Sequence, residues 1–108
     1  MTMPFSLKTL NAFEMMHRAA ACEIPAKYDD HRAFVGIYPP MQDKKIRQWR
    51  VTRFEIPSKL VFRNFGQEDL VEFQSLHRNS LEEIEDILRS WGVASSLFDA
   101  PWKCDWPL

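Results

Sequence analysis

The chain has 108 residues, a formal net charge of −1, and hydrophobic and charged fractions of 45% and 27%. This length suits one domain with one modest core, and eight Phe, four Trp and two Tyr supply enough apolar surface to exclude a disordered chain. No apolar run approaches the roughly 20 residues that cross a bilayer, and three glycines are too few for a Gly-rich phosphate loop.

The N-terminal part predicts a helix and then a strand. From about residue 6 to residue 21, apolar residues such as Leu7 and Leu10 recur near helical spacing, and Ser6 can serve as the N-cap. Pro25 blocks any continuation of this helix. The segment 32–38 is the first predicted strand, because it is largely apolar and two consecutive prolines end it.

The middle of the chain predicts an antiparallel meander. Residues 46–56 are expected to form a long strand whose apolar residues change from one face to the other near Thr52, which indicates a bulge or a twist there. Residues 59–65 alternate in the same way and are expected to pair with that strand as a hairpin. After a turn at 66–69, residues 70–76 form the next strand.

The clearest predicted element is a helix over residues 81–91. Ser80 and Glu83 have the spacing of a capping box, and Gly92 stands where a C-terminal cap glycine belongs. Apolar residues mark one face of this helix. The chain is therefore expected to form one α+β domain over residues 1–108. Its antiparallel sheet of three to four strands carries an N-terminal helix and a capped C-terminal helix packed on it.

Charge is divided unevenly along the chain. Residues 1–65 carry eleven basic and six acidic side chains, a net +5, whereas residues 66–108 carry three basic and nine acidic ones, a net −6. The tail 97–108 is rich in Trp and Pro and is expected to lie extended across the domain. Acidic and tryptophan side chains of this second half are the predicted partner-binding residues. They are Glu68, Asp69, Glu72, Glu82, Glu83, Glu85, Asp86, Trp102 and Trp106.

Catalytic and cofactor chemistry finds little support in the sequence. The three histidines are far apart, and Cys22 and Cys104 complete no C-x-x-C pattern, so we expect neither a metal site nor a cofactor, and two free thiols. No serine lies in a G-x-S-x-G elbow. A basic stretch at 44–53 contains Trp49 and could serve an RNA-binding sheet, but a pI near 6.3 disfavours nucleic-acid binding.

The order of elements in the second half resembles a known family. The strand segments 49–56 and 59–62, the acidic helix 80–92 and the tail 101–108 are similar to small bacterial immunity proteins, which protect a cell from polymorphic toxins such as those of contact-dependent growth inhibition. The resemblance covers about half of the chain. It implies a non-enzymatic cytoplasmic inhibitor of one cognate toxin domain. Such toxins are often nucleases with basic active sites, which an acidic surface would complement.

We therefore expect an immunity protein that covers the active site or substrate-binding surface of a toxin. The charged residues of the first 20 and the absence of an apolar core there do not fit a signal peptide, so the expected location is the cytoplasm. An accessory subunit with another protein partner is the first alternative, a small nucleic-acid-binding domain the second, and an enzyme the last. The partner's identity and the oligomeric state stay open.

Overall fold

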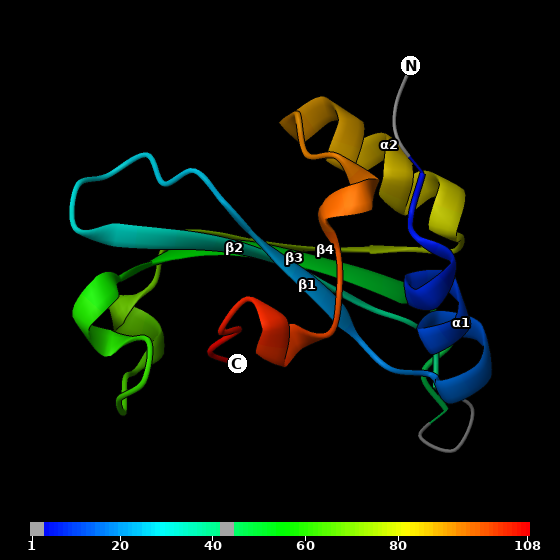
Figure 1. The fold of residues 1–108 in the computed structure, drawn as a ribbon, viewed down its shortest axis with the longest axis horizontal. Helices are drawn as coiled ribbons and strands as arrows, with labels where there is room; N and C mark the ends of the chain where they lie inside the picture. The colour runs from blue at the N-terminus through cyan, green and yellow to red at the C-terminus, as the bar shows by residue number, and fades with distance from the viewer. Residues whose placement is uncertain (1–3, 42–44) are drawn as a thin grey trace.

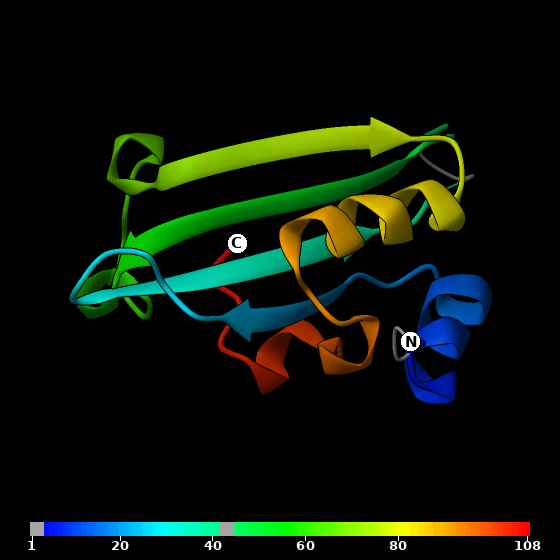
Figure 2. The same cartoon turned by 90° about the horizontal axis from the view of Figure 1, so that it is seen from above.

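A four-stranded antiparallel sheet organises the molecule, in the order β1 (Ala20–Ile24), β2 (His31–Tyr38), β3 (Trp49–Pro57) and β4 (Val71–Arg78). The structure is a computed structural model that describes residues 4–41 and 45–108. Helix α2 (Leu81–Trp91) lies over one face of the sheet, and helix α1 (Leu7–Met16) stands beside the β1 edge (Figures 1 and 2). The expected α+β architecture is confirmed. None of the helices within the described ranges is long and apolar enough to cross a membrane.

Two clusters of buried side chains cover the two faces of the sheet. The larger cluster joins both helices to one face, and Phe5 contacts Phe13 and Phe98 edge to face at 5.6 Å. The smaller cluster lies on the opposite face around Phe34 and Phe54, under the segment 58–70 and the C-terminal tail. Residues of β2 and β3 alternate between the two clusters, so both central strands are buried on both sides.

Helix α2 has the bounds expected from the sequence. The Ser80 hydroxyl accepts a hydrogen bond from the Glu83 backbone N–H at 3.2 Å, and the Glu83 carboxylate accepts one from the Asn79 N–H at 3.2 Å. In the usual capping box, the glutamate side chain accepts from the N–H of the N-cap residue, which is Ser80 here. In this helix it accepts instead from the N–H of the preceding residue, Asn79. Gly92 ends the helix with φ of 72°, in the left-handed region. Ile84, whose side chain is fully buried, lies on the face turned to the sheet.

The N-terminal helix is shorter than expected, because residues 20 and 21 belong to a strand. Ser6 caps α1 as predicted, with its hydroxyl accepting from the Thr9 N–H at 3.2 Å. His17 then takes a left-handed conformation, with φ of 52°, and ends the helix. Strand β1 pairs with β2 and buries Ala20 and Cys22 in the larger cluster. Pairing and burial override the helix propensity of the alanines.

The predicted strand over residues 59–65 is wrong. Residues 58–60 form a single 3₁₀ turn, and β3 pairs with β2 on one edge and β4 on the other, which leaves it no edge for a third partner. Leu60, Val61 and Phe65 pack on the smaller cluster instead. Strand β4 confirms the strand expected at 70–76. The strand expected from residue 46 begins at Trp49.

The irregularity lies close to the expected position, next to Thr52, but its extra residue is on the neighbouring strand β4. Thr52 pairs regularly with Ser75, whereas the register shifts where Arg53 faces Gln74 and Glu55 faces Val71. The step spans two residues on β3 and three on β4, so the extra residue is on β4. Glu72 lies inside this step with φ of 55°, a left-handed conformation that is typical of some bulges.

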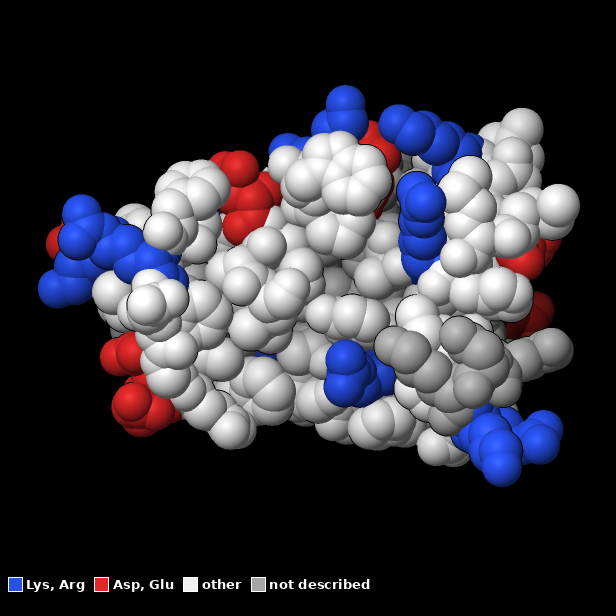
Figure 3. Space-filling model, turned by 90° about the horizontal axis from the view of Figure 1, so that it is seen from below, with Lys and Arg blue, Asp and Glu red and all other residues white. Residues whose placement is uncertain are grey.

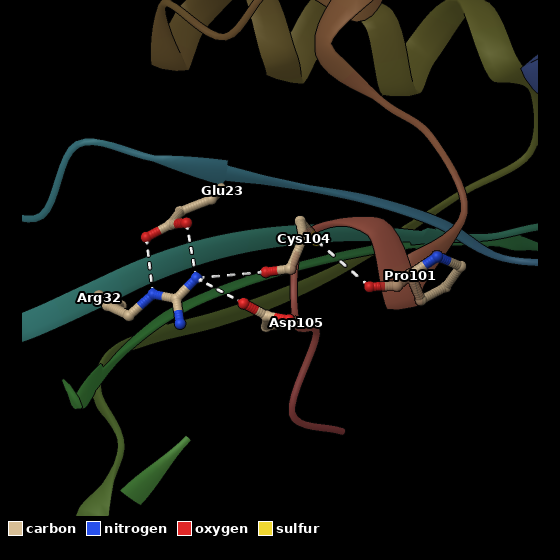
Figure 4. A network of polar contacts seen from close by, with 5 residues as sticks. All are labelled: Glu23, Arg32, Pro101, Cys104 and Asp105. Carbon is tan, nitrogen blue, oxygen red and sulfur yellow. Dashed lines mark hydrogen bonds and ion pairs between the residues drawn. The ribbon is translucent and has the colours of Figure 1, made fainter. Parts of the chain in front are cut away.

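The C-terminal tail crosses the free edge of β1 and reaches the opposite face. Asp99 and Ala21 exchange backbone hydrogen bonds at 2.9 and 3.1 Å, and a 3₁₀ turn follows at 101–103. Arg32 then holds the tail, since its guanidinium donates to Glu23 at 2.7 and 2.8 Å and to Asp105 at 3.2 Å (Figure 4). The tail lies across the domain as expected, but it is not extended throughout, because residues 101–103 form the 3₁₀ turn.

Candidate functional site

Helix α2 presents an acidic outer face. Glu82, Glu83 and Asp86 are exposed and Glu85 is half-buried, whereas the apolar side of the same helix is buried against the sheet. Asp86 pairs with Arg89 on the next turn at 2.7 Å, and Glu83 caps the helix. Glu82 makes no ion pair or side-chain hydrogen bond with any residue that the structure describes. Helix α2 is therefore firmly packed on the sheet, and its carboxylates face the solvent.

Of the three other predicted acidic residues, Glu68 and Asp69 lie in a turn at one end of the sheet and Glu72 lies in the edge strand β4. Glu68 is exposed in a 3₁₀ turn, and the Asp69 carboxylate accepts from the Gly66 N–H at 2.8 Å, which ties it to the fold of that turn. Glu72 accepts from the Tyr28 hydroxyl at 2.9 Å and pairs with Lys27 at 3.5 Å. These two partners lower the pKa of Glu72, the Tyr28 hydrogen bond most strongly.

The acidic residues therefore do not gather on one surface. Helix α2 lies above the sheet in Figure 1, while residues 67–69 lie beyond one end of it and on the opposite side. Seen from that opposite side, most of the middle of the molecule is uncharged, and most charged side chains stand toward its rim (Figure 3). A single partner of ordinary size could cover α2 or residues 67–72, so each is a separate candidate surface.

The two tryptophans of the tail differ in their surroundings. The Trp102 side chain is 69% exposed, which suits a binding role. Trp106 packs on the smaller cluster, with its ring centroid 5.2 Å from that of Phe54 and its indole N–H donating to the Tyr38 hydroxyl at 3.0 Å. The indole also lies directly over Gly36. Trp106 thus anchors the tail, and a binding role for it stays a prediction.

The basic stretch of β3 does not form an open base-stacking platform around Trp49. Trp49 packs edge to face on Phe13 at 5.3 Å, beside the larger cluster. Arg53 lies over the Trp91 ring at 5.0 Å on the same face, whereas Arg50 lies over Tyr38 at 4.3 Å on the other. Because Trp49 is engaged in packing, it is poorly placed to stack on a nucleic-acid base.

Both cysteines carry thiols whose pKa values are raised. Cys22 and Cys104 are free thiols, as expected. Burial raises the pKa of Cys22 to about 12 and also raises that of Cys104, which opposes thiolate formation at neutral pH. Within residues 4–41 and 45–108, no group of three His, Cys, Asp or Glu side chains could hold a metal ion.

The sequence reasoning missed a pocket between α1 and the tail. Its volume is about 420 Å³, and it is lined by α1, by the residues that follow α1, by Met41 and by the tail at 99–102. Trp102 is the only predicted partner-binding residue in its wall. No periodicity in the sequence could have indicated this pocket, since its walls come from three separate parts of the chain.

Comparisons with family models, with curated proteins and with solved structures found no match to this chain.

Proposed function

We propose that this chain is a non-catalytic cytoplasmic inhibitor that binds a basic protein partner, in the manner of an immunity protein that neutralises a toxin domain. The acidic outer face of α2 carries the proposal. Glu82, Glu83 and Asp86 stand exposed on a helix that has a cap at each end. Rigid presentation reduces the ordering cost on binding, so these charges are well suited to recognition.

The chemistry of a nuclease toxin complements this face. A protein that accepts phosphate backbones must be basic around its active site. Acidic side chains that face such a surface speed the association of the two proteins, and they repel partners that are themselves negatively charged. Exposed charges act through solvent, so the affinity of the complex is expected to fall as salt is raised. The partner's active site would be closed because the inhibitor occupies it.

The test uses the toxin domain encoded immediately upstream of the gene for this chain. Bacteria that express this toxin domain are expected to grow when the chain is co-expressed. The double variant Glu82→Lys with Asp86→Lys is expected to lose protection and to bind the purified toxin domain at least tenfold more weakly, as a rough estimate for two reversed charges. Neither residue supplies a cap, so the helix should still fold.

A matched control separates local charge from net charge. The double variant Glu14→Lys with Asp29→Lys changes net charge equally at exposed positions away from α2 and is expected to keep protection. An equal loss of protection in both double variants would show that protection depends on the net charge of the chain and not on the α2 face. If the α2 variant still protects, the toxin-binding site is not on α2. The Glu68→Lys variant would then test whether the site is at residues 67–72. No protection by the unaltered chain would refute the inhibitor function.

A further inference from the structure

The pocket between α1 and the tail has mainly apolar walls. Ala12 and Met16 line it from α1, and Met41, Pro101 and Trp102 line it from the other sides. Its volume of about 420 Å³ falls within the range of small-molecule sites, roughly 300–1,000 Å³. Such sites bind the apolar part of a ligand by burial and fix its orientation by a few polar groups.

Charged side chains in the wall of the pocket carry a net positive charge. Lys8, Arg18 and Asp99 contribute the charged groups. Lys8 pairs with Asp99 at 3.6 Å, so these two charges largely offset each other. Arg18 makes no ion pair or side-chain hydrogen bond with any residue in the described ranges. Its guanidinium is therefore available to a ligand that reaches the pocket.

The position of Arg18 is set by the backbone at the end of α1. Its N–H donates to the Ala12 carbonyl at 3.0 Å, the long-range bond of a helix C-terminal cap. His17, which has a left-handed backbone conformation, ends α1 and turns the chain just before Arg18. The polar Thr9 in the wall is already engaged, because its hydroxyl donates to the Phe98 carbonyl at 2.9 Å. Arg18 is thus the permanently charged group of the described wall that is left to orient a ligand, and the polar His17 lines the pocket beside it.

We propose that this pocket binds a small amphipathic anion, with an apolar chain against Met16 and Trp102 and a carboxylate paired with Arg18. A guanidinium and a carboxylate can form two parallel hydrogen bonds, so this pairing also fixes the direction of the ligand. The inference goes beyond the proposed function and does not depend on it.

The first experiment compares decanoate with decanol, by calorimetric titration into the full chain below the concentration at which either aggregates. Decanoate is expected to bind more tightly than decanol. Arg18→Gln should weaken decanoate binding about fivefold, the value of a partly exposed charged hydrogen bond, and leave decanol unchanged. Arg63→Gln, an exposed arginine outside the pocket, is the matched control and should leave both unchanged.

A second pair of variants tests the location. Ala12→Leu adds bulk inside the pocket and should abolish binding of both ligands, whereas Asn11→Leu adds bulk to the same helix outside it and should not. Circular dichroism and the unfolding midpoint confirm that each variant folds. Absence of decanoate binding, equal effects of the two arginine variants, or binding that survives Ala12→Leu would each overturn the proposal. If only a peptide or protein competes for the pocket, the small-anion assignment is wrong.

Discussion

The packing of Trp106 on Gly36 gives a sharp test of how the tail is held. A Cβ atom added at Gly36 would lie 2.5 Å from Cη2 and 2.6 Å from Cζ2 of Trp106, closer than packed atoms approach. The backbone of Gly36 is regular strand, paired with Ala21 and Thr52, so alanine suits its conformation. Gly36→Ala should therefore act almost entirely by displacing the indole.

The magnitude follows from what the indole loses. Complete truncation of a buried Trp costs about 3–5 kcal/mol, so displacing the half-buried Trp106 should cost about 2 kcal/mol. Alanine is favoured over glycine within a strand by about 0.5 kcal/mol. Gly36→Ala should thus destabilise the protein by about 1.5 kcal/mol. In a Trp106→Ala background the clash is absent, and the same change should stabilise by about 0.5 kcal/mol.

Urea unfolding followed by far-ultraviolet circular dichroism measures the four free energies of unfolding in this cycle. The expected coupling between the two positions is about 2 kcal/mol, well above the usual error of additivity. Equal effects of Gly36→Ala in both backgrounds would refute the packing of the indole on Gly36. They would also remove the main apolar anchor that we assign to the tail.

Three further outcomes follow from the structure. Ser80→Ala should lower the free energy of unfolding by about 1 kcal/mol in the same urea assay, because the N-cap of α2 is lost; no change would contradict the cap. The Arg32 hydrogen bond lowers the pKa of Glu23 below its ordinary value of 4.5, so this pair stabilises fully above pH 4.5 and is lost as the pH falls through the lower, folded-state pKa. The Glu23→Gln variant should therefore lose stability less steeply than the unaltered chain as the pH falls. Equal slopes of the unfolding midpoint against pH for the two proteins would contradict this. With a pKa raised to about 12, Cys22 in a Cys104→Ser variant should react with an aromatic disulfide reagent at neutral pH only as fast as the protein unfolds; rapid labelling of the folded protein would contradict its burial.

The helix over residues 81–91 could be predicted in full because every local signal agreed. Ser80, Gly92 and the apolar face all indicate the same bounds, and tertiary packing had nothing to override. The exposed acidic face followed from the same periodicity, so that part of the candidate site was predictable too. The location of residues 67–69 beyond one end of the sheet, on the side opposite α2, depends on chain topology, which no local signal encodes.

The errors arose where alternation or propensity was the only guide. Residues 59–65 alternate like a strand, yet the edges of β3 were taken by β2 and β4. Ala20 and Ala21 favour a helix locally, but pairing with β2 decides their conformation. The pocket depends on contacts between α1 and the tail, which are about ninety positions apart in the sequence. Long-range contacts of this kind cannot be read from spacing alone.

The late position of Trp106 in the chain has a consequence for folding during synthesis. The four strands are neighbours in sequence order, so β1 to β4 can pair as each one leaves the ribosome. Phe34 and Phe54 remain without the indole until residue 106 has also emerged. The nascent sheet therefore exposes apolar surface on that face in the interval between the emergence of β4 and that of Trp106. Chaperone binding and aggregation should concentrate in that interval.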